Sequence, residues 1–382
     1  MTVSARVGGD GYLYDRVTRH ILDLVEKGTL KPGDRAPSLR GLSKQLRVSI
    51  STVSQAYAAL QELGVLRVRP QSGYFVDGQV SRQQGSRVPR KTTVSRQPRK
   101  VRFGELFDEI FSVANDPQVV PLGAAVPSVE LMPVKGLLRA TQRAASREPE
   151  HAVNYYFPPG HPGLRREIAR RYVDLGLSVD PENIIITSGC SEALSLSLQA
   201  VTRRGDIVAV ESPSYFSVLR LIERMGLLAV EIDSDPETGL CLDALESAIE
   251  TMDIKAVVAV LNFSNPVGSL MPDANKEQLV GMLEQADIPL IEDDIHGDLH
   301  FGEQRPAIAK CYDRKGMVLT CSSFSKTIAP GYRIGWVIAD RYRNDVVELK
   351  HATSSAMCSL PQMAMADYLR SGEYDRHLVR LR

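Results

Sequence analysis

From residue 103 onward, short apolar runs alternate with amphipathic helical patterns, and this alternation limits the possible folds more than any other feature. Each run is continuous and bounded by turn residues, as in strands that are buried on both faces. We expect strands over 183–187, 207–211, 228–232, 256–261, 289–292, 317–321 and 333–339, and helices over 190–202, 215–225, 242–251 and 273–285. The alternation predicts an α/β layer structure with a mostly parallel sheet.

One stretch, 322–336, places a single lysine, Lys326, among small hydroxyl residues and between two expected buried strands. A lysine held there loses hydration, which should lower its pKa and make its neutral amine available as a nucleophile. Seven residues on, Arg333 carries a permanent planar charge that suits a phosphate. Such a pair is what a pyridoxal-phosphate (PLP) enzyme needs. A surface loop with a solvated lysine is an equal alternative for this stretch alone, because a short S-x-x-K match is weak.

Other polar residues follow the expected strands, where parallel sheets bind ligands. Residues 187–192 form a tight turn into a helix, whose N–H groups and Ser191 favour a phosphate. Tyr215 could cover a flat ring, Asn265 could donate to a phenolic oxygen, and a carboxylate among 292–294 could hold a pyridinium nitrogen protonated. The ordinary alternatives are a turn that binds nothing, a core tyrosine, a turn asparagine, and a helix cap or metal pair.

Charge is balanced over the 382 residues, with 46 basic and 46 acidic side chains, but it is unevenly distributed. The first 102 residues carry a net charge of +12 and the remainder −12, so a polyanion partner is expected for the front of the chain. The five cysteines are scattered, which suggests reduced thiols and no metal site. Without an apolar run of 18 residues or a signal-peptide pattern, the protein is expected to be soluble and cytoplasmic, away from membranes.

A smaller pattern precedes the α/β region. We expect helices over 12–28 and after the N-caps Ser38 and Ser49, and strands over 65–69 and 74–77. Three helices and a hairpin make a winged helix-turn-helix, whose third helix enters the major groove of double-stranded DNA by its N-terminal turn. The alternative is a small helical docking domain with a solvated polar face.

Polar and basic residues of this pattern are the candidates for DNA contacts. The first turn of the third helix could reach phosphates or base edges through Ser49, Ser51, Thr52 and Gln55. Further backbone contacts are expected from Arg40, Lys44, Arg67 and Arg69, with Gly73 in the wing. Residues 78–102 are rich in Ser, Gln, Pro and Arg and are expected to be a flexible linker. Its eight cations could track DNA phosphates, or the segment could be a tether only.

Four motifs in this front region carry a family resemblance. They are P-S-L-R at 37–40, V-S-I-S-T-V at 48–53, L-G-V-L at 63–66 and S-G-Y-F-V at 72–76. Together they resemble the DNA-binding domain of the GntR regulators over 12–77. Many members of that family have an arginine at the place of Ile50, and some have one at Ser54, so part of the usual contact set is absent here.

The order of the strand-end residues resembles the large domain of the fold-type-I (class I/II) aminotransferases, over roughly 120–380. The resemblance implies that Lys326 forms an internal aldimine with PLP, that Asp293 pairs with the pyridine nitrogen and that Asn265 bonds the ring oxygen. It further implies ring stacking by Tyr215 and a phosphate site made by Cys190, Ser191, Ser323, Ser325 and Arg333. In a dimer, Tyr155 would reach the phosphate of the neighbouring subunit.

The sequence departs from that family in two places. A tyrosine usually follows the aspartate by two or three residues, where this chain has Ile295 and His296; His296 could substitute, with a different pKa. The family also continues past this point, through a small domain that holds the arginine for the substrate carboxylate. We therefore expect an incomplete small domain, and a last helix with Tyr374, Leu378 and Leu381 whose packing partners are missing.

The combination, a GntR-type domain at 1–77, a linker at 78–102 and an aminotransferase-like domain at 103–382, resembles the MocR subfamily. This resemblance implies a PLP-dependent transcriptional regulator that binds promoter DNA as a homodimer and senses a small amino compound. One alternative is a working aminotransferase with an appended DNA-binding domain, for which the missing arginine makes efficient turnover less expected. The other is a scaffold that no longer binds PLP.

Overall fold

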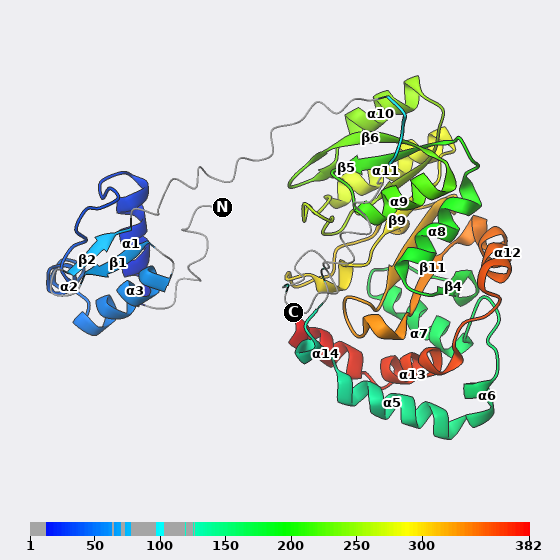
Figure 1. The fold of residues 1–382 in the computed structure, drawn as a ribbon, viewed down its shortest axis with the longest axis horizontal. Coiled ribbons are helices and arrows are strands. Elements are labelled where there is room, and N and C mark those ends of the chain that lie inside the picture. The colour runs from blue at the N-terminus through cyan, green and yellow to red at the C-terminus, as the bar shows by residue number, and fades with distance from the viewer. Residues whose placement is uncertain are drawn as a thin grey trace. The chain divides into compact units, whose positions relative to one another are not determined.

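The computed structural model describes residues 13–62, 65–69, 73–77, 97–102, 119, 125 and 127–382. The chain divides into two compact units, Met1–Arg90 and Lys91–Arg382 (Figure 1). Most of the expected linker, 78–96, lies outside the described residues, as does the expected hairpin turn at 70–72. The smaller unit has a hydrophobic core of its own, separate from those of the larger unit.

In its described residues, the smaller unit contains three helices and a two-stranded sheet. Its elements are α1 (Leu13–Glu26), α2 (Leu39–Leu46), α3 (Ile50–Glu62), β1 (Leu66–Arg69) and β2 (Gly73–Val76). The two strands pair antiparallel, with Leu66 opposite Val76. The predicted winged helix-turn-helix is therefore confirmed.

Local sequence explains where two of these helices begin. Ser38 Oγ accepts a hydrogen bond from Gly41 N at 3.0 Å, and Ser49 Oγ accepts one from Thr52 N at 3.0 Å. A serine cap satisfies an N–H group that has no partner within the helix, which contributes about 1 kcal/mol. Tyr57 of α3 lies in the core, and its hydroxyl donates to Pro37 O at 2.8 Å, which ties α3 to the segment before α2.

The larger unit is built on a nine-stranded sheet in the order β3-β6-β5-β8-β9-β10-β11-β4, with β7 paired to β6. The strands are β3 (Arg99–Lys100), β4 (Ile184–Thr187), β5 (Ile207–Ser212), β6 (Leu228–Asp235), β7 (Gly239–Leu240), β8 (Ile254–Ala259), β9 (Leu290–Asp293), β10 (Val318–Ser323) and β11 (Gly335–Ile338). Strands β6, β5, β8, β9 and β10 pair parallel, whereas β11 is antiparallel to both β10 and β4. The expected mostly parallel sheet is confirmed. A loop rather than a crossover helix joins β10 to β11, which permits the antiparallel pair, and this loop carries Lys326.

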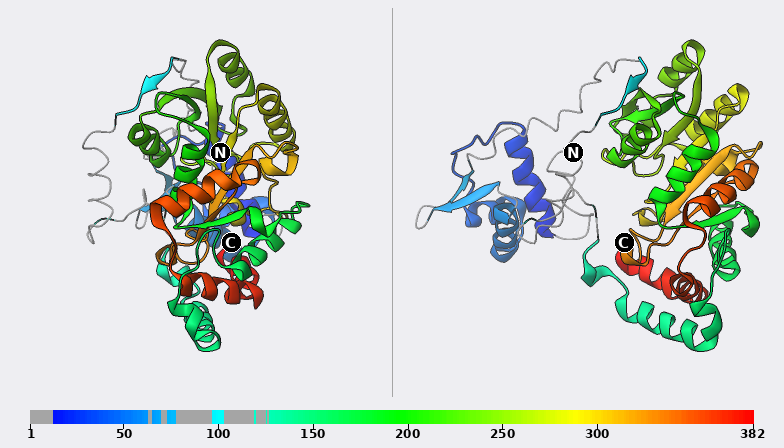
Figure 2. Two further views of the ribbon diagram at one scale, coloured as in Figure 1. Left: turned by 90° about the vertical axis from the view of Figure 1, so that its right-hand side faces the viewer. Right: turned by 45° about the vertical axis from the view of Figure 1, so that its right-hand side comes forward.

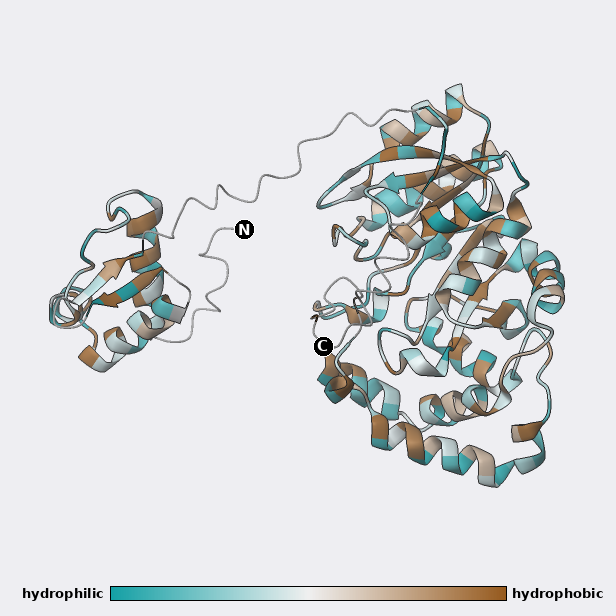
Figure 3. Ribbon diagram, in the orientation of Figure 1, coloured by the Kyte–Doolittle hydropathy of each residue, from teal (hydrophilic) through white to brown (hydrophobic). Residues whose placement is uncertain are grey.

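Helices cover both faces of the sheet, as two further views show (Figure 2). They are α5 (Val134–Arg147), α6 (Pro149–Val153), α7 (Pro162–Val173), α8 (Cys190–Val201), α9 (Phe216–Met225), α10 (Leu242–Thr251), α11 (Asp273–Ala286), α12 (Arg343–Ser354), α13 (Ser359–Arg370) and α14 (Glu373–Leu381). Val208 and Val210 of β5 pack in one core with α8, α9 and α12, whereas Ala209 packs in another with α10 and α11. This period of two is what a strand buried on both faces requires, and the strands are accordingly hydrophobic in Figure 3.

Two expectations about less regular segments are corrected by the structure. Arg99 and Lys100, placed in the linker from sequence, form β3 on the edge of the sheet beside β6. An edge strand needs only backbone partners, so its polar composition gave no signal. The last helix, α14, does have packing partners: Tyr374 and Leu378 are buried in a core with Phe324 of the Lys326 loop.

Among the described residues, no helix is both long and apolar enough to cross a membrane.

Candidate functional site

Lys326 lies in the loop between β10 and β11, and the buried side chain of Phe324 anchors this loop to the core. Phe324 is buried, and its ring centroid lies 4.8 Å from that of Trp336 and 5.6 Å from that of Tyr374. Lys326 Nζ donates to Ala125 O at 2.9 Å. Burial lowers the pKa of Lys326, and nearby Asp293 only partly opposes this. A lowered pKa makes the neutral, nucleophilic amine more available.

Asp293 ends β9 and faces the start of α8. Its Oδ1 accepts hydrogen bonds from Cys190 Sγ at 3.3 Å and from Ile295 N at 3.2 Å. Burial raises the pKa of Asp293 to about 6, although these hydrogen bonds and Lys326 favour the charged form. A desolvated carboxylate of this kind pairs readily with a cationic ring nitrogen, because the cation restores the stabilisation that burial removes.

The neighbouring acids of the 292–294 triplet have other partners. Glu292 accepts from Ala309 N at 2.7 Å and from Thr320 Oγ1 of the neighbouring strand β10 at 3.2 Å. Asp294 accepts from Asn262 Nδ2 at 3.0 Å and pairs with Arg305. Asp293 is therefore the acid of this triplet that lies beside Cys190 and Lys326.

The turn after β4 approaches Arg333 closely. Gly189 has φ +81°, and a Cβ there would collide with the Arg333 guanidinium. A Cβ on Gly335 would lie 2.5 Å from the Gly189 carbonyl carbon. Arg333 Nη2 donates to Ser188 O at 2.8 Å. Two glycines thus let a permanent cation lie against the N-terminus of α8, an arrangement suited to a phosphate.

The serines predicted for the phosphate site lie at the two adjoining loops. Ser191 is exposed in the first turn of α8, and Ser323 is buried at the end of β10. Ser323 Oγ accepts from Ser325 N at 3.3 Å, which shapes the backbone immediately before Lys326. The structure therefore gathers the phosphate-type residues from β4, α8 and β10 at one edge of the sheet.

The ring-type residues differ in placement. Tyr215 is half-buried before α9, and burial raises its pKa, with Asp293 and Cys190 adding to the shift. His296 is half-buried too; burial and Lys326 lower its pKa, and its buried Nδ1 has no hydrogen-bond partner among the described residues. Asn265 is half-buried in the turn after β8, where Gly268 N bonds Ser264 O at 2.6 Å. Tyr155 is 71% exposed, with its ring 5.5 Å from that of Phe157.

The N-terminal turn of α3 presents a cluster of hydroxyl groups. Ser49 Oγ lies 2.7 Å from both Ser51 Oγ and Thr52 Oγ1. Gln55 is exposed on the next turn. The predicted phosphate-contacting cations Arg40, Lys44, Arg67 and Arg69 are all exposed, and the Arg69 guanidinium stacks 4.6 Å from the Phe75 ring centroid. Gly73 has φ +100° at the start of β2.

Comparison with known proteins gives the same two parts. Residues 13–76 match the family described as bacterial regulatory proteins, gntR family, and residues 117–375 match aminotransferase class I and II. The uncharacterized HTH-type transcriptional regulators YjiR and YdcR of Escherichia coli are each 38% identical over 97% of this chain and 78% of their own length. The chain belongs to the MocR subfamily of GntR regulators.

Solved structures resemble the larger part of this MocR-type chain. An archaeal alanine:glyoxylate aminotransferase is 27% identical, with a TM-score of 0.64 over 67% of this chain and 64% of that one. The α-aminoadipate aminotransferase LysN of Thermus thermophilus, solved with N-(5'-phosphopyridoxyl)-L-leucine, is 26% identical, with a TM-score of 0.63 over 74% of this chain and 73% of that one. The fold-type-I architecture expected from sequence is thereby confirmed.

The residues present fit pyridoxal phosphate. The glycine-lined turn beside Arg333 suits its phosphate, and buried Asp293 suits its pyridine nitrogen. The unpartnered Nδ1 of His296 leaves a buried polar atom that a ring substituent could satisfy. When bound, this cofactor supplies an electron sink. The chain's own contribution would be to hold the ring and to keep the Lys326 amine partly desolvated.

An ion pair that the sequence did not reveal supports the phosphate-type turn. Glu192 Oε2 accepts from Ser188 N at 2.6 Å and from the buried Lys350 Nζ, in α12, at 2.7 Å. Ser188 is thus held at its N–H by Glu192 and at its carbonyl by Arg333. A lysine 158 positions away from its partner leaves no local sequence pattern.

Lys350→Met is expected to lower the free energy of unfolding of the larger unit by about 2–3 kcal/mol, because Glu192 would keep a largely buried charge without its partner. PLP binding should weaken as the Ser188 turn loosens. Denaturant unfolding and cofactor titration measure both effects. The matched control is Lys255→Met, whose ion pair with Asp253 is exposed and is expected to contribute nothing measurable. A Lys350→Met protein with unchanged stability would contradict the assignment, whereas recovery on adding Glu192→Gln would support it.

Glu211 of β5 predicts an unusual pH dependence of stability. It is buried, accepts from Val260 N at 3.0 Å, and has its pKa raised by burial from 4.5 to about 8. Between these values the folded chain binds more protons than the unfolded chain, so stability falls as pH rises. Glu211→Gln should remove this loss, stabilising the protein by up to about 4 kcal/mol at pH 9 but little at pH 5. Urea midpoints across pH test this, with exposed Glu250→Gln as the control; parallel wild-type and Glu211→Gln profiles would contradict it.

Proposed function

We propose that this protein is a transcriptional regulator that binds promoter DNA through its winged helix-turn-helix and PLP through its larger unit. A small amino compound that reacts at the Lys326 site would change DNA binding. One observation carries the proposal: an amine whose pKa is lowered by burial lies within electrostatic reach of the buried Asp293 carboxylate, in a chain that also presents a hydroxyl-capped recognition helix. The relatives named as HTH-type transcriptional regulators, including NorG of Staphylococcus aureus at 28% identity, support the DNA-binding role, and with it a cytoplasmic site of action.

The DNA-binding part can be tested by selecting duplexes from a random library and measuring affinity by fluorescence anisotropy. Gln55→Ala should lose affinity for the selected duplex but little for random duplex, because Gln55 is proposed to reach base edges. Arg67→Ala should weaken both and reduce the salt slope by about one, because each phosphate contact releases about one counterion. Equal wild-type affinity for selected and random duplexes at moderate salt would contradict the proposal.

The sensing part can be tested by adding PLP and then single amino acids or amines to the DNA complex. A compound that changes both the visible absorbance of the cofactor and the affinity for DNA would support it. The Lys326→Ala protein should bind DNA but not respond. Spectral changes without any change in DNA affinity, across a broad set of amines, would contradict sensing.

A homodimer is supported by exposed apolar side chains at the end of α6 and in the residues that follow it. Val153 is 89% exposed, Tyr155 71% and Phe157 56%, all within one short segment. Exposed aromatic and aliphatic groups in one segment are typical of surfaces that associate, and Tyr155 is the residue proposed to reach a neighbouring subunit. Sedimentation equilibrium measures the mass; a monomer at micromolar concentration would contradict the dimer.

Aminotransferase activity is the second candidate, favoured by the same Lys326 and Asp293 geometry. An amino acid would then convert the bound cofactor to its amine form, and a 2-oxo acid would convert it back. Formation of more than one 2-oxo acid per bound cofactor, when a second 2-oxo acid is supplied as amino acceptor, would favour the enzyme, whereas reversible binding without product would favour the sensor.

A further inference from the structure

Two side chains of helix α14 form hydrogen bonds with Thr327, the residue that directly follows Lys326. The Tyr374 hydroxyl lies 3.1 Å from Thr327 Oγ1, and His377 Nε2 lies 2.7 Å from Thr327 O. All three side chains are buried. Both the hydroxyl and the carbonyl of Thr327 are therefore fixed by one helix, which limits the positions that the Lys326 backbone can adopt.

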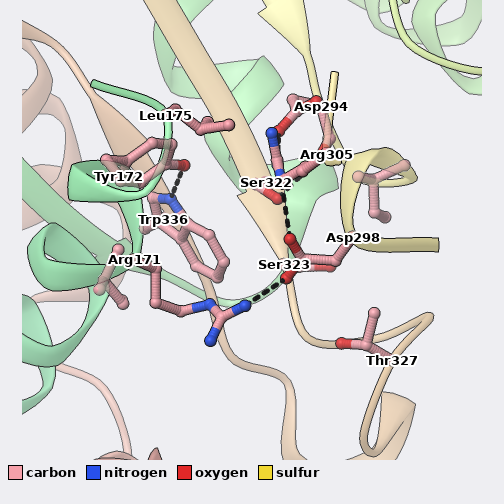
Figure 4. A pocket seen from close by; sticks show the side chains of 12 residues that line it. Arg171, Tyr172, Leu175, Asp294, Asp298, Arg305, Ser322, Ser323, Thr327 and Trp336 are labelled. Carbon is pink, nitrogen blue, oxygen red and sulfur yellow. Dashed lines mark hydrogen bonds and ion pairs between the residues drawn. The ribbon is translucent and has the colours of Figure 1, made fainter. Parts of the chain in front are cut away.

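Tyr374 also connects this loop to a partly buried chain of charges, part of which is shown in Figure 4. Its hydroxyl donates to Asp298 Oδ2 at 2.8 Å, so its oxygen is left to accept from Thr327. Burial raises the pKa of Asp298, but Arg171 and Arg305 outweigh it and lower the pKa to about 2. The carboxylate is thus a strong, permanently charged acceptor for the Tyr374 hydroxyl.

The charge chain continues from Asp298 to the end of β9. Arg305 Nε donates to Asp298 Oδ1 at 2.7 Å, and Arg305 Nη2 pairs with Asp294. Asp294 is held in turn by Asn262 Nδ2 at 3.0 Å and, through its N–H, by Cys321 O at 2.9 Å. Asp294 directly follows Asp293. The row of charged side chains therefore connects the loop that carries Lys326 to the end of β9 that carries Asp293.

Tyr374 is itself firmly placed. The Arg171 guanidinium stacks 4.2 Å from its ring centroid and also pairs with Asp298 at 3.3 Å and Asp375 at 2.8 Å. At the start of α14, Glu373 pairs with Arg139 of α5 at 3.3 Å. A hydroxyl on such a support can hold Thr327 without moving itself, which is what a positioning group requires.

We propose that Tyr374 is a positioning residue for the cofactor site: its hydroxyl links the Lys326 loop, through Thr327, to Asp298, Arg305 and the Asp293 end of β9, and so sets Lys326 relative to Asp293. This inference rests on the proposed PLP binding. Without the hydroxyl, Thr327 loses one of its two anchors and the lysine samples more positions. The covalent link to the cofactor then forms less readily and breaks faster.

The test compares Tyr374→Phe with Tyr368→Phe in the full chain. Tyr368 is equally buried, but within the described part of the chain its hydroxyl makes a single long hydrogen bond, 3.4 Å to Glu373 O. Tyr374→Phe is expected to release PLP to a hydroxylamine trap about tenfold faster, as expected for losing a hydrogen bond to a charged group. It should also shift the pH at which the visible band titrates, a change that general destabilisation would not produce. Tyr368→Phe should remain within about twofold of wild type.

A second variant keeps the test independent of folding defects in the first. Thr327→Val removes the other partner of the same hydrogen bond, and Thr327→Ser restores it. The double variant Tyr374→Phe/Thr327→Val should release PLP no faster than the worse single variant, because each single change already removes the Tyr374–Thr327 hydrogen bond. Fully multiplicative effects, or a Tyr374→Phe protein that matches wild type, would overturn the proposal. Wild type that forms no covalent link would instead overturn PLP binding itself, and the role of Tyr374 with it.

Discussion

Lys326→Ala is expected to abolish the covalent attachment of PLP. Borohydride reduction of the wild-type complex should fix a phosphopyridoxyl group on the peptide that contains Lys326, and mass spectrometry should find none in the variant. The physical reason is that burial lowers the pKa of Lys326 by more than nearby Asp293 raises it, so its amine is neutral often enough to react. The fold should be retained, because Phe324 and Thr327 anchor the loop without the lysine side chain.

The matched control is Lys255→Ala, which removes an exposed lysine of β8. This variant should bind PLP covalently at Lys326 and show the same visible absorbance as wild type. Covalent cofactor on another lysine, or an unchanged visible band in Lys326→Ala, would contradict the site. Both the sensor and the enzyme interpretations would then fail, while DNA binding by the smaller unit would be unaffected.

Gly189→Ala is expected to have the second-largest effect. Gly189 has φ +81° and ψ 175°, a conformation that is nearly restricted to glycine, and a Cβ there would collide with the Arg333 guanidinium. Strain and displacement of Arg333 together should lower the free energy of unfolding by about 3 kcal/mol. PLP affinity should fall as well, because Arg333 is proposed to hold the phosphate. Thermal unfolding and cofactor titration measure the two effects.

Gly281→Ala provides the matched control. Gly281 lies within α11 and a Cβ there meets nothing within 4 Å, so the exchange should stabilise the helix by up to about 1 kcal/mol. If Gly189→Ala behaved like Gly281→Ala, the close approach of Arg333 to the turn would not matter for binding, and the phosphate site would have to lie elsewhere.

Local chemistry made several features predictable. Ser38 and Ser49 mark helix starts because a serine hydroxyl reaches its own helix two or three residues on, and the structure confirms both. The buried strands were recognisable because residues covered on both faces must be apolar throughout. The loop that carries Lys326 was recognisable because strands flank a short run of small hydroxyl residues. The order of such motifs also gave the family, which the comparisons show.

The amino-acid sequence by itself therefore determined the two-part architecture, the element types and the strand ends where the candidate cofactor residues gather. Only the tertiary structure decided that Asp293 bonds Cys190, which lysine holds Glu192, and how Tyr374 reaches Thr327. These partners are 47 to 158 positions apart. Caps and strands depend on neighbours along the chain, which a sequence pattern records, whereas these contacts depend on how distant elements pack, which no local pattern records.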